Sequence, residues 1–227
     1  MTYTLITANR NYSSWSLRPW LLMKGLDIPF ADRIEPFAKA TNYDAFRVFS
    51  PTGQVPVLID GERTVYDSLG IALYLADRHE GIWPTEESAR VWAQCAAAEM
   101  HGGFSALRND CPMNVGVRVQ PKPMTGALLA NVARLRELWL DGLTRFGGPY
   151  LAGSEFCAAD AFFAPVAWRV RTYGLDVGAA QAWVDHIIVH PAMRQWEREA
   201  LTESWREVGH EDELRASGEV IADYRTG

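Results

Sequence analysis

Three serine hydroxyls stand close together near the start of the chain, at Ser13, Ser14 and Ser16. Pro19 follows, and because proline lacks a backbone N–H it fits best within the first turn of a helix. This spacing predicts a helix that begins near Ser16, with Ser13 and Ser14 on the approach to it. A hydroxyl donor beside the free N–H groups of a helix start favours the ionised form of a bound acid such as a thiol.

A second candidate anion site follows at Asp67 and Ser68. Apolar residues recur at helical spacing after Ser68, so the pair stands at the start of a helix. Free N–H groups at such a start attract a carboxylate. Ser68 also has an alternative role as the N-cap of this helix, and the two roles are compatible.

The stretch from Ser50 to Leu58 precedes this pair and contains Gln54, Val55 and Pro56. In this order and spacing, the two segments together resemble the thioredoxin-like domain of the glutathione S-transferase family. The resemblance implies that the Val55-Pro56 peptide bond is cis. It also implies that the backbone of Val55 pairs with the cysteinyl unit of glutathione, the co-substrate, and that Gln54 reaches its glycyl end.

By the same resemblance, Asp67 and Ser68 hold the amino and carboxylate groups of the γ-glutamyl unit. The stretch that contains Ser13 and Ser14 is similar to the serine motif of the zeta class, whose members are maleylacetoacetate isomerases that also conjugate glutathione. This similarity makes Ser14 the catalytic hydroxyl, with Ser13 beside it. Tyr12 is a rival for the same role, and simple helix capping is the alternative for the serines.

Two residues of the second half are candidates for contacts with the substrate. His101 lies on a predicted helix facing the cleft, where bacterial members of the family often carry Glu-x-His; a packed or surface histidine is the alternative. Arg169 and Arg171 end a buried-looking helix. In the zeta enzymes an arginine of this helix binds an acidic substrate, so one of the two is a candidate for this role, and we assign it to Arg171; a surface salt bridge is the alternative.

The predicted elements divide the chain into two parts. Strands are expected at 3–7, 29–34, 57–59 and 63–66, and helices through 20–23, near 43–48 and from 68. This βαβ-ββα order is the thioredoxin topology. After a linker at 81–85, helical spacing recurs at 91–107, 128–146 and 161–173 and around Trp183 and Trp196, without strand signals. We expect an α/β plus all-α fold, with a thioredoxin-like domain at 1–80 and an all-helical domain at 87–227.

Two further motifs have structural interpretations. Cys157 and Asp160 match the family's capping box, although a thiol is a poor acceptor, so we expect Asp160 to hold the local turn. His186 and His190 stand four apart, a spacing found in metal sites. No third ligand or catalytic glutamate accompanies them, so no metal is expected.

Composition excludes several classes of protein. The 227 residues carry a net charge of -6, which argues against a nucleic-acid footprint. No apolar run approaches the roughly 18–20 residues of a membrane span, and no signal peptide is recognised. The cysteines, Cys95, Cys111 and Cys157, are odd in number and widely spaced, as in a cytoplasmic protein. None precedes Cys95, which excludes a Cys-x-x-Cys redox site from the first turn.

These observations lead to one expected function. We expect a cytoplasmic homodimer that transfers glutathione to an electrophilic small molecule, as enzymes of detoxification do. A glutathione-dependent cis-trans isomerase is the alternative enzyme. A non-catalytic binding protein with the same fold is the alternative of a different class. The sequence does not identify the electrophile, because fold does not fix function.

Overall fold

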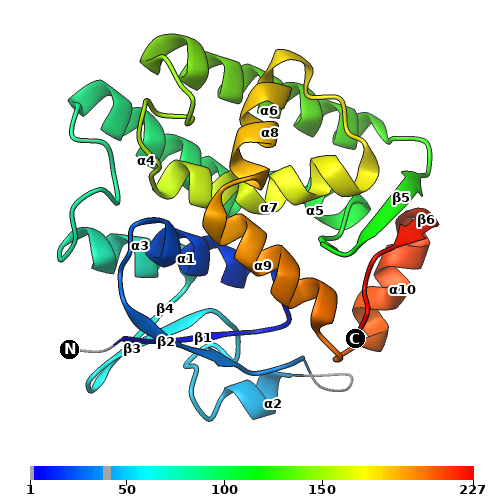
Figure 1. Cartoon of the computed structure of the whole chain (residues 1–227), viewed down its shortest axis with the longest axis horizontal. Helices are drawn as coiled ribbons and strands as arrows, with labels where there is room; N and C mark the ends of the chain where they lie inside the picture. Colours follow the sequence, from blue (N-terminus) through cyan, green and yellow to red (C-terminus); the bar gives the residue numbers. More distant parts are fainter. Residues whose placement is uncertain (1–2, 38–41) are drawn as a thin grey trace.

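The N-terminal part is a four-stranded mixed sheet covered by helices (Figure 1). The computed structural model describes residues 3–37 and 42–227. The sheet has the order β2-β1-β3-β4, with β1 and β2 parallel and the other pairs antiparallel. The elements of this part are β1 (Tyr3–Thr7), α1 (Ser14–Gly25), β2 (Phe30–Ile34), α2 (Tyr43–Phe46), β3 (Val57–Asp60), β4 (Arg63–Tyr66) and α3 (Ser68–Ala76). The thioredoxin-like topology is confirmed.

Helix α1 lies at the centre of the molecule and is buried along most of its length. It packs against β1 and α3 on the sheet and against α7 (Ala158–Tyr173) of the C-terminal part. Leu17, Trp20 and Leu21 are fully buried. The N-terminus of α1 is therefore held at a fixed place between the two parts of the chain.

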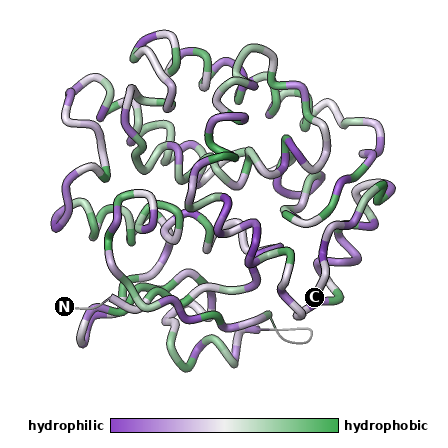
Figure 2. Tube along the Cα trace, viewed as in Figure 1, coloured by the Kyte–Doolittle hydropathy of each residue, from purple (hydrophilic) through white to green (hydrophobic). Residues whose placement is uncertain are grey.

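The C-terminal part is helical, and α7 is its central helix. Every residue of α7 except Arg171 is buried. Around it lie α4 (Glu87–Gly102), α5 (Ser105–Asp110), α6 (Gly126–Phe146), α8 (Gln181–Ile188) and α9 (Pro191–Thr202). Figure 2 shows hydrophobic and hydrophilic residues alternating along the surrounding helices, as expected for helices with one buried face.

The start of α7 is fixed by Asp160, as the capping motif predicts. The Asp160 carboxylate accepts hydrogen bonds from the backbone N–H of Cys157 at 3.1 Å and of Leu151 at 2.9 Å. The indole N–H of Trp183 donates a further bond to it at 2.9 Å. Asp160 therefore joins the loop before α7 to helix α8.

The chain after α9 forms a segment that the sequence analysis did not predict. It consists of α10 (Val208–Ser217) and β6 (Gly218–Asp223). Strand β6 pairs antiparallel with β5 (Val117–Pro121) in a second, two-stranded sheet, which is a departure from an all-helical domain. Figure 1 shows this red segment alongside β5. We call residues 203–227 the C-terminal strap.

The C-terminal strap is anchored to the loop that precedes α1. The carboxylate of Glu203, which is 6% exposed, accepts hydrogen bonds from the backbone N–H groups of Arg10 at 2.7 Å and Asn11 at 3.3 Å. The side chain of Asn11 in turn accepts a bond from the N–H of Gly116 at 3.1 Å. Segments far apart in the chain therefore hold this loop jointly. Within the described ranges, no helix has the length and apolar character needed to cross a bilayer.

Candidate active site

A cavity of about 600 Å³ lies between the two parts of the chain, at the N-terminus of α1. From the N-terminal part it is lined by the start of α1, the loop at 52–56 and the start of α3. From the C-terminal part it is lined by Arg108, Pro112, Met113 and Arg169, and from the C-terminal strap by His210 and Glu213. The cavity therefore brings together the predicted residues Ser13, Ser14, Gln54, Val55, Pro56, Asp67 and Ser68.

The helix start differs from the prediction. Ser13, not Ser16, is the N-cap of α1; its hydroxyl accepts from the N–H of Ser16 at 3.4 Å and donates to the Ser16 hydroxyl at 2.7 Å. Pro19 lies inside the helix rather than in its first turn. The loop before α1, held by the C-terminal strap, sets the cap position, so the preference of proline for a first turn does not decide it.

The three candidate hydroxyls at the cavity differ in their partners. The hydroxyl of Ser13 is occupied by Ser16. The hydroxyl of Tyr12 donates to Glu211 at 2.6 Å, and burial, followed by this carboxylate, raises the pKa of Tyr12. The hydroxyl of Ser14 makes no hydrogen bond with any residue in the two described stretches, and it opens α1. Ser14 is therefore the hydroxyl available to a ligand.

The loop before β3 presents Gln54, Val55 and Pro56 to the cavity. The Val55-Pro56 bond is cis, as the resemblance implies. The hydroxyl of Ser50 donates to the carbonyl of Gln54 at 2.6 Å and accepts from its N–H at 3.2 Å. This serine closes the loop on itself. No described residue pairs with the backbone N–H or C=O of Val55. Both groups are therefore available to a peptide-like ligand.

Asp67, rather than Ser68, is the N-cap of α3. One oxygen of the Asp67 carboxylate accepts from the N–H of Leu69 at 2.8 Å, and the backbone of Asp67 has φ of 69°. Ser68 is the first helical residue, and its hydroxyl accepts from Nη1 of Arg18 at 3.4 Å. The capping alternative for Ser68 is thus wrong. Both residues line the cavity at the N-terminus of α3, where the Asp67 carboxylate already accepts from the N–H groups of Leu69 and Gly70.

His101 contacts residues of the site without lining the cavity itself. Its Nε2 lies 3.3 Å from the second carboxylate oxygen of Asp67. Its ring meets the edge of Trp15 at 5.2 Å between ring centroids. Burial lowers the pKa of His101 although Asp67 opposes the change, with Arg18 and Arg108 adding to it. His101 is therefore a neutral ring that lies against the Asp67 carboxylate.

Arg18 is a buried cation that contacts Trp15 of the cavity wall, and the sequence analysis missed its importance. It is 0% exposed, and its Nε and Nη2 have no partner in the part of the chain described. Its guanidinium lies 4.0 Å from the ring centre of Trp15, and that of Arg108 lies 4.5 Å from the same ring. Burial, and then the charges of Arg108 and Arg169, lower the pKa of Arg18. Trp15 thus holds two cations beside the cavity.

Arg171 does not line the cavity. It pairs with Glu197 at 2.8 Å, as the salt-bridge alternative expected. Arg169 of the same helix lines the cavity instead. Its Nε donates to the carbonyl of Cys111 at 2.8 Å and its Nη1 to that of Pro165 at 3.2 Å, whereas Nη2 has no hydrogen-bond partner among the described residues.

The paired histidines have local roles in the fold. His190 is the N-cap of α9, where its Nδ1 accepts from the N–H of Ala192 at 3.2 Å. His186 packs its ring on Tyr150. In residues 3–37 and 42–227 no cluster of three His, Cys, Asp or Glu side chains is arranged to hold a metal ion.

Comparisons with known proteins identify the family. A family model for the glutathione S-transferase N-terminal domain matches residues 12–78, and one for the C-terminal domain matches 86–199. Glutathione S-transferase Z2 of Arabidopsis thaliana is 26% identical over 168 residues, which are 68% of this chain and 73% of that protein. Dichloromethane dehalogenase of Methylorubrum extorquens is 39% identical over 61 residues, so the match spans 26% of this chain and only 21% of that protein.

A solved structure shows the same fold. A glutathione transferase homologue from Burkholderia, determined with bound glutathione, has a TM-score of 0.67 at 19% identity and covers 88% of this chain and 98% of its own. The two family models together span most of the chain. The chain belongs to the glutathione S-transferase family and is a glutathione transferase.

Proposed function

We propose that the protein forms the thiolate of glutathione and transfers it to an electrophilic carbon of a small molecule. The observation that carries the proposal is the free hydroxyl of Ser14, which shares one cavity with the unpaired backbone of Val55 and with Asp67 and Ser68. A tripeptide placed along Val55, with its γ-glutamyl end at α3, points its sulfur towards the start of α1. Ser14 is then the catalytic residue that donates to sulfur.

The surroundings of the sulfur explain why it ionises. A free thiol has a pKa near 8.5, so little of it is ionised at neutral pH. The hydroxyl of Ser14, the N-terminus of α1 and the cations Arg18, Arg108 and Arg169 all favour a negative charge there. Asp67 and Glu213 are the carboxylates that line the cavity among the described residues. Arg108 and Arg169 balance these two carboxylates in the cavity wall, so the excess positive charge comes from the buried Arg18.

The arginines favour a second candidate, the glutathione-dependent isomerase of an acidic substrate. Arg108 and Arg169 approach the cavity from the C-terminal part, opposite the residues assigned to glutathione. Guanidinium groups bind carboxylates through charge-assisted hydrogen bonds. We therefore transfer the role first given to Arg171 to Arg169, and we expect acidic electrophiles to be preferred over neutral ones.

The first prediction is that glutathione binds the native protein and stabilises it. A ligand that binds only the folded state adds about 2.7 kcal/mol at a hundredfold excess over its dissociation constant. Thermal melting with millimolar glutathione should therefore shift upwards, and an ultraviolet difference spectrum should show thiolate. Binding without thiolate would favour the non-catalytic alternative, and no shift together with no heat of binding would contradict the proposal.

The second prediction assigns the activating hydroxyl. Losing a hydrogen bond to a charged group costs about 1.5–3 kcal/mol, which corresponds to a roughly ten- to hundredfold loss of thiolate. Ser14→Ala should therefore raise the pKa of bound glutathione and slow turnover, with glutathione affinity retained. Ser13→Ala and Tyr12→Phe are the matched controls and should change the thiolate population less. If Ser14→Ala keeps full activity and one of the controls loses activity, the residue replaced in that control is the one that activates the thiol.

The third prediction concerns the acidic substrate. Arg169→Met keeps most of the side-chain volume and removes the charge, so it should raise KM for a carboxylate-bearing electrophile at least tenfold. Its effect on a neutral electrophile should be small. Arg171→Met, which breaks the pair with Glu197 and a contact with the ring of Trp168 outside the cavity, is the control. Equal losses for both electrophiles would show that Arg169 does not select for acids.

The fourth prediction is a homodimer. Leu73 on α3 and Val91 on α4 are 52% and 53% exposed, and the two helices are in contact. Tyr66 of β4 is also exposed. Two-fold dimers are the commonest oligomers, and a second copy would cover these apolar side chains. Light scattering should give twice the chain mass of 25.4 kDa; the mass of one chain at micromolar concentration would refute this.

A further inference from the structure

His210 of the C-terminal strap lies in the wall of the cavity, between two aromatic rings. Its ring stacks on Tyr12 with centroids 4.9 Å apart and an interplanar angle of 19°. It stacks on Phe37 at 4.9 Å and 18°. All three rings line the cavity. The matched family model ends at residue 199, so His210 lies outside the part of the chain that the model describes.

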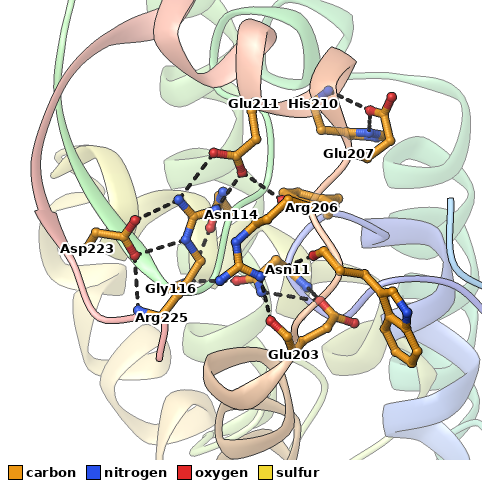
Figure 3. A network of polar contacts seen from close by, with 12 residues as sticks. Asn11, Asn114, Gly116, Glu203, Arg206, Glu207, His210, Glu211, Asp223 and Arg225 are labelled. Carbon is orange, nitrogen blue, oxygen red and sulfur yellow. Dashed lines mark hydrogen bonds and ion pairs between the residues drawn. The ribbon is translucent and has the colours of Figure 1, made fainter. Parts of the chain in front are cut away.

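A carboxylate fixes the tautomer of the His210 ring. Its Nδ1 lies 2.7 Å from the carboxylate of Glu207, the N-cap of α10 (Figure 3). An ionised carboxylate only accepts hydrogen bonds, so Nδ1 carries the proton and Nε2 carries the lone pair. No residue in the two described stretches forms a hydrogen bond with Nε2. A histidine oriented in this way by a carboxylate is suited to accept a proton at its other nitrogen.

None of the groups around His210 pairs with its Nε2 in the part of the chain described. Tyr12 stands two residues before Ser14, but its hydroxyl is committed to Glu211 at 2.6 Å. The charge of Glu211 is met by Arg225, with Arg206 nearby (Figure 3). Phe37 carries no titratable group. Glu213 lines the cavity without a hydrogen bond to the His210 ring within the described ranges.

We propose that His210 is a catalytic residue whose Nε2 accepts the proton of the glutathione thiol. The S–H bond breaks, the N–H bond forms at Nε2, and the electron pair stays on sulfur as the thiolate. The resulting imidazolium lies between Glu207 and the thiolate. When the thiolate adds to an activated double bond, the proton passes to the carbanion formed, so the net reaction is addition of the thiol. The inference rests on the proposed function.

The roles of Ser14 and His210 are distinct. A serine hydroxyl donates a hydrogen bond to the thiolate but keeps its own proton, so it stabilises the charge without removing the thiol proton. A histidine removes that proton and retains it as a neighbouring positive charge. An opposite charge within about 4–6 Å lowers the pKa of an acid by about 1–3 units. Loss of His210 should therefore reduce the thiolate population in addition to any effect of Ser14.

The test uses His210→Phe in the full chain, because phenylalanine keeps the stack with Tyr12 and Phe37 but accepts no proton. The ultraviolet absorbance of bound glutathione thiolate is followed from pH 5 to pH 9. We expect the thiol pKa to rise by at least about one unit, a loss of about tenfold in thiolate at pH 6.5. Glu207→Gln should give a smaller rise. His186→Phe, at a ring that packs on Tyr150 outside the cavity, should titrate like the wild type.

A thiol-free ligand separates this inference from the proposed function. S-methylglutathione should raise the melting temperature of the wild type and of His210→Phe equally, which shows that the cavity is intact. If His210→Phe does not fold, His210→Gln replaces it in the same measurement. A thiolate titration of the folded variant identical to the wild type overturns the role of His210 and leaves the transferase proposal standing. Failure of the wild type to bind either ligand overturns both.

Discussion

The placement of helix α1 is the constraint on which the site depends. Its side chains are buried against the sheet, α3 and α7, while its first turn reaches the cavity. The free N–H groups and the hydroxyl of Ser14 are therefore positioned by the core rather than by a loop. Ser13 caps the N–H of Ser16 and the N–H of Ser14 is bound to the carbonyl of Tyr12, so the hydroxyl of Ser14 is the group of this turn that remains available to a ligand. Activation of sulfur and stability of the fold thus rely on the same helix.

The buried charge of Arg18 gives the cavity its electrostatic character. A buried ion without a close partner is costly, and Arg18 has only Ser68 as a side-chain hydrogen-bond partner in the described part of the protein. The aromatic faces of Trp15 and Phe162 supply part of the missing solvation. Because Arg18 contacts Trp15, which lines the cavity, its charge attracts an anion placed there.

Much of the N-terminal part was predictable because its signals are local. The hairpin at β3 and β4, the cis bond at Val55-Pro56 and the placement of Asp67 and Ser68 follow from short motifs. The N-cap of α1 was placed wrongly because the preceding loop is fixed by Glu203, which is remote in sequence. The C-terminal strap was missed because its short helix and strand are polar and gain order from their contacts.

Whether Arg169 or Arg171 faces the cavity depends on the rotation of α7 about its own axis. Positions 169 and 171 differ by about 200° around a helix, so the packing of α7 decides which of them meets the ligand. The pairing of His210 with Tyr12 and Phe37 joins positions that no sequence spacing relates. Such side chains are brought together only by the tertiary fold.

The anchoring of the C-terminal strap has a consequence for synthesis. The bond from the N–H of Arg10 to Glu203 joins residues 193 positions apart, and the cavity wall at α10 lies beyond it. Domains generally fold in order as the chain emerges from the ribosome, at about 5–20 residues per second. The sheet and helix α1 are therefore synthesised before the wall of the cavity that α10 supplies. A nascent chain at that stage lacks the cavity residues of α10, and the cavity is complete only when the C-terminal strap has emerged.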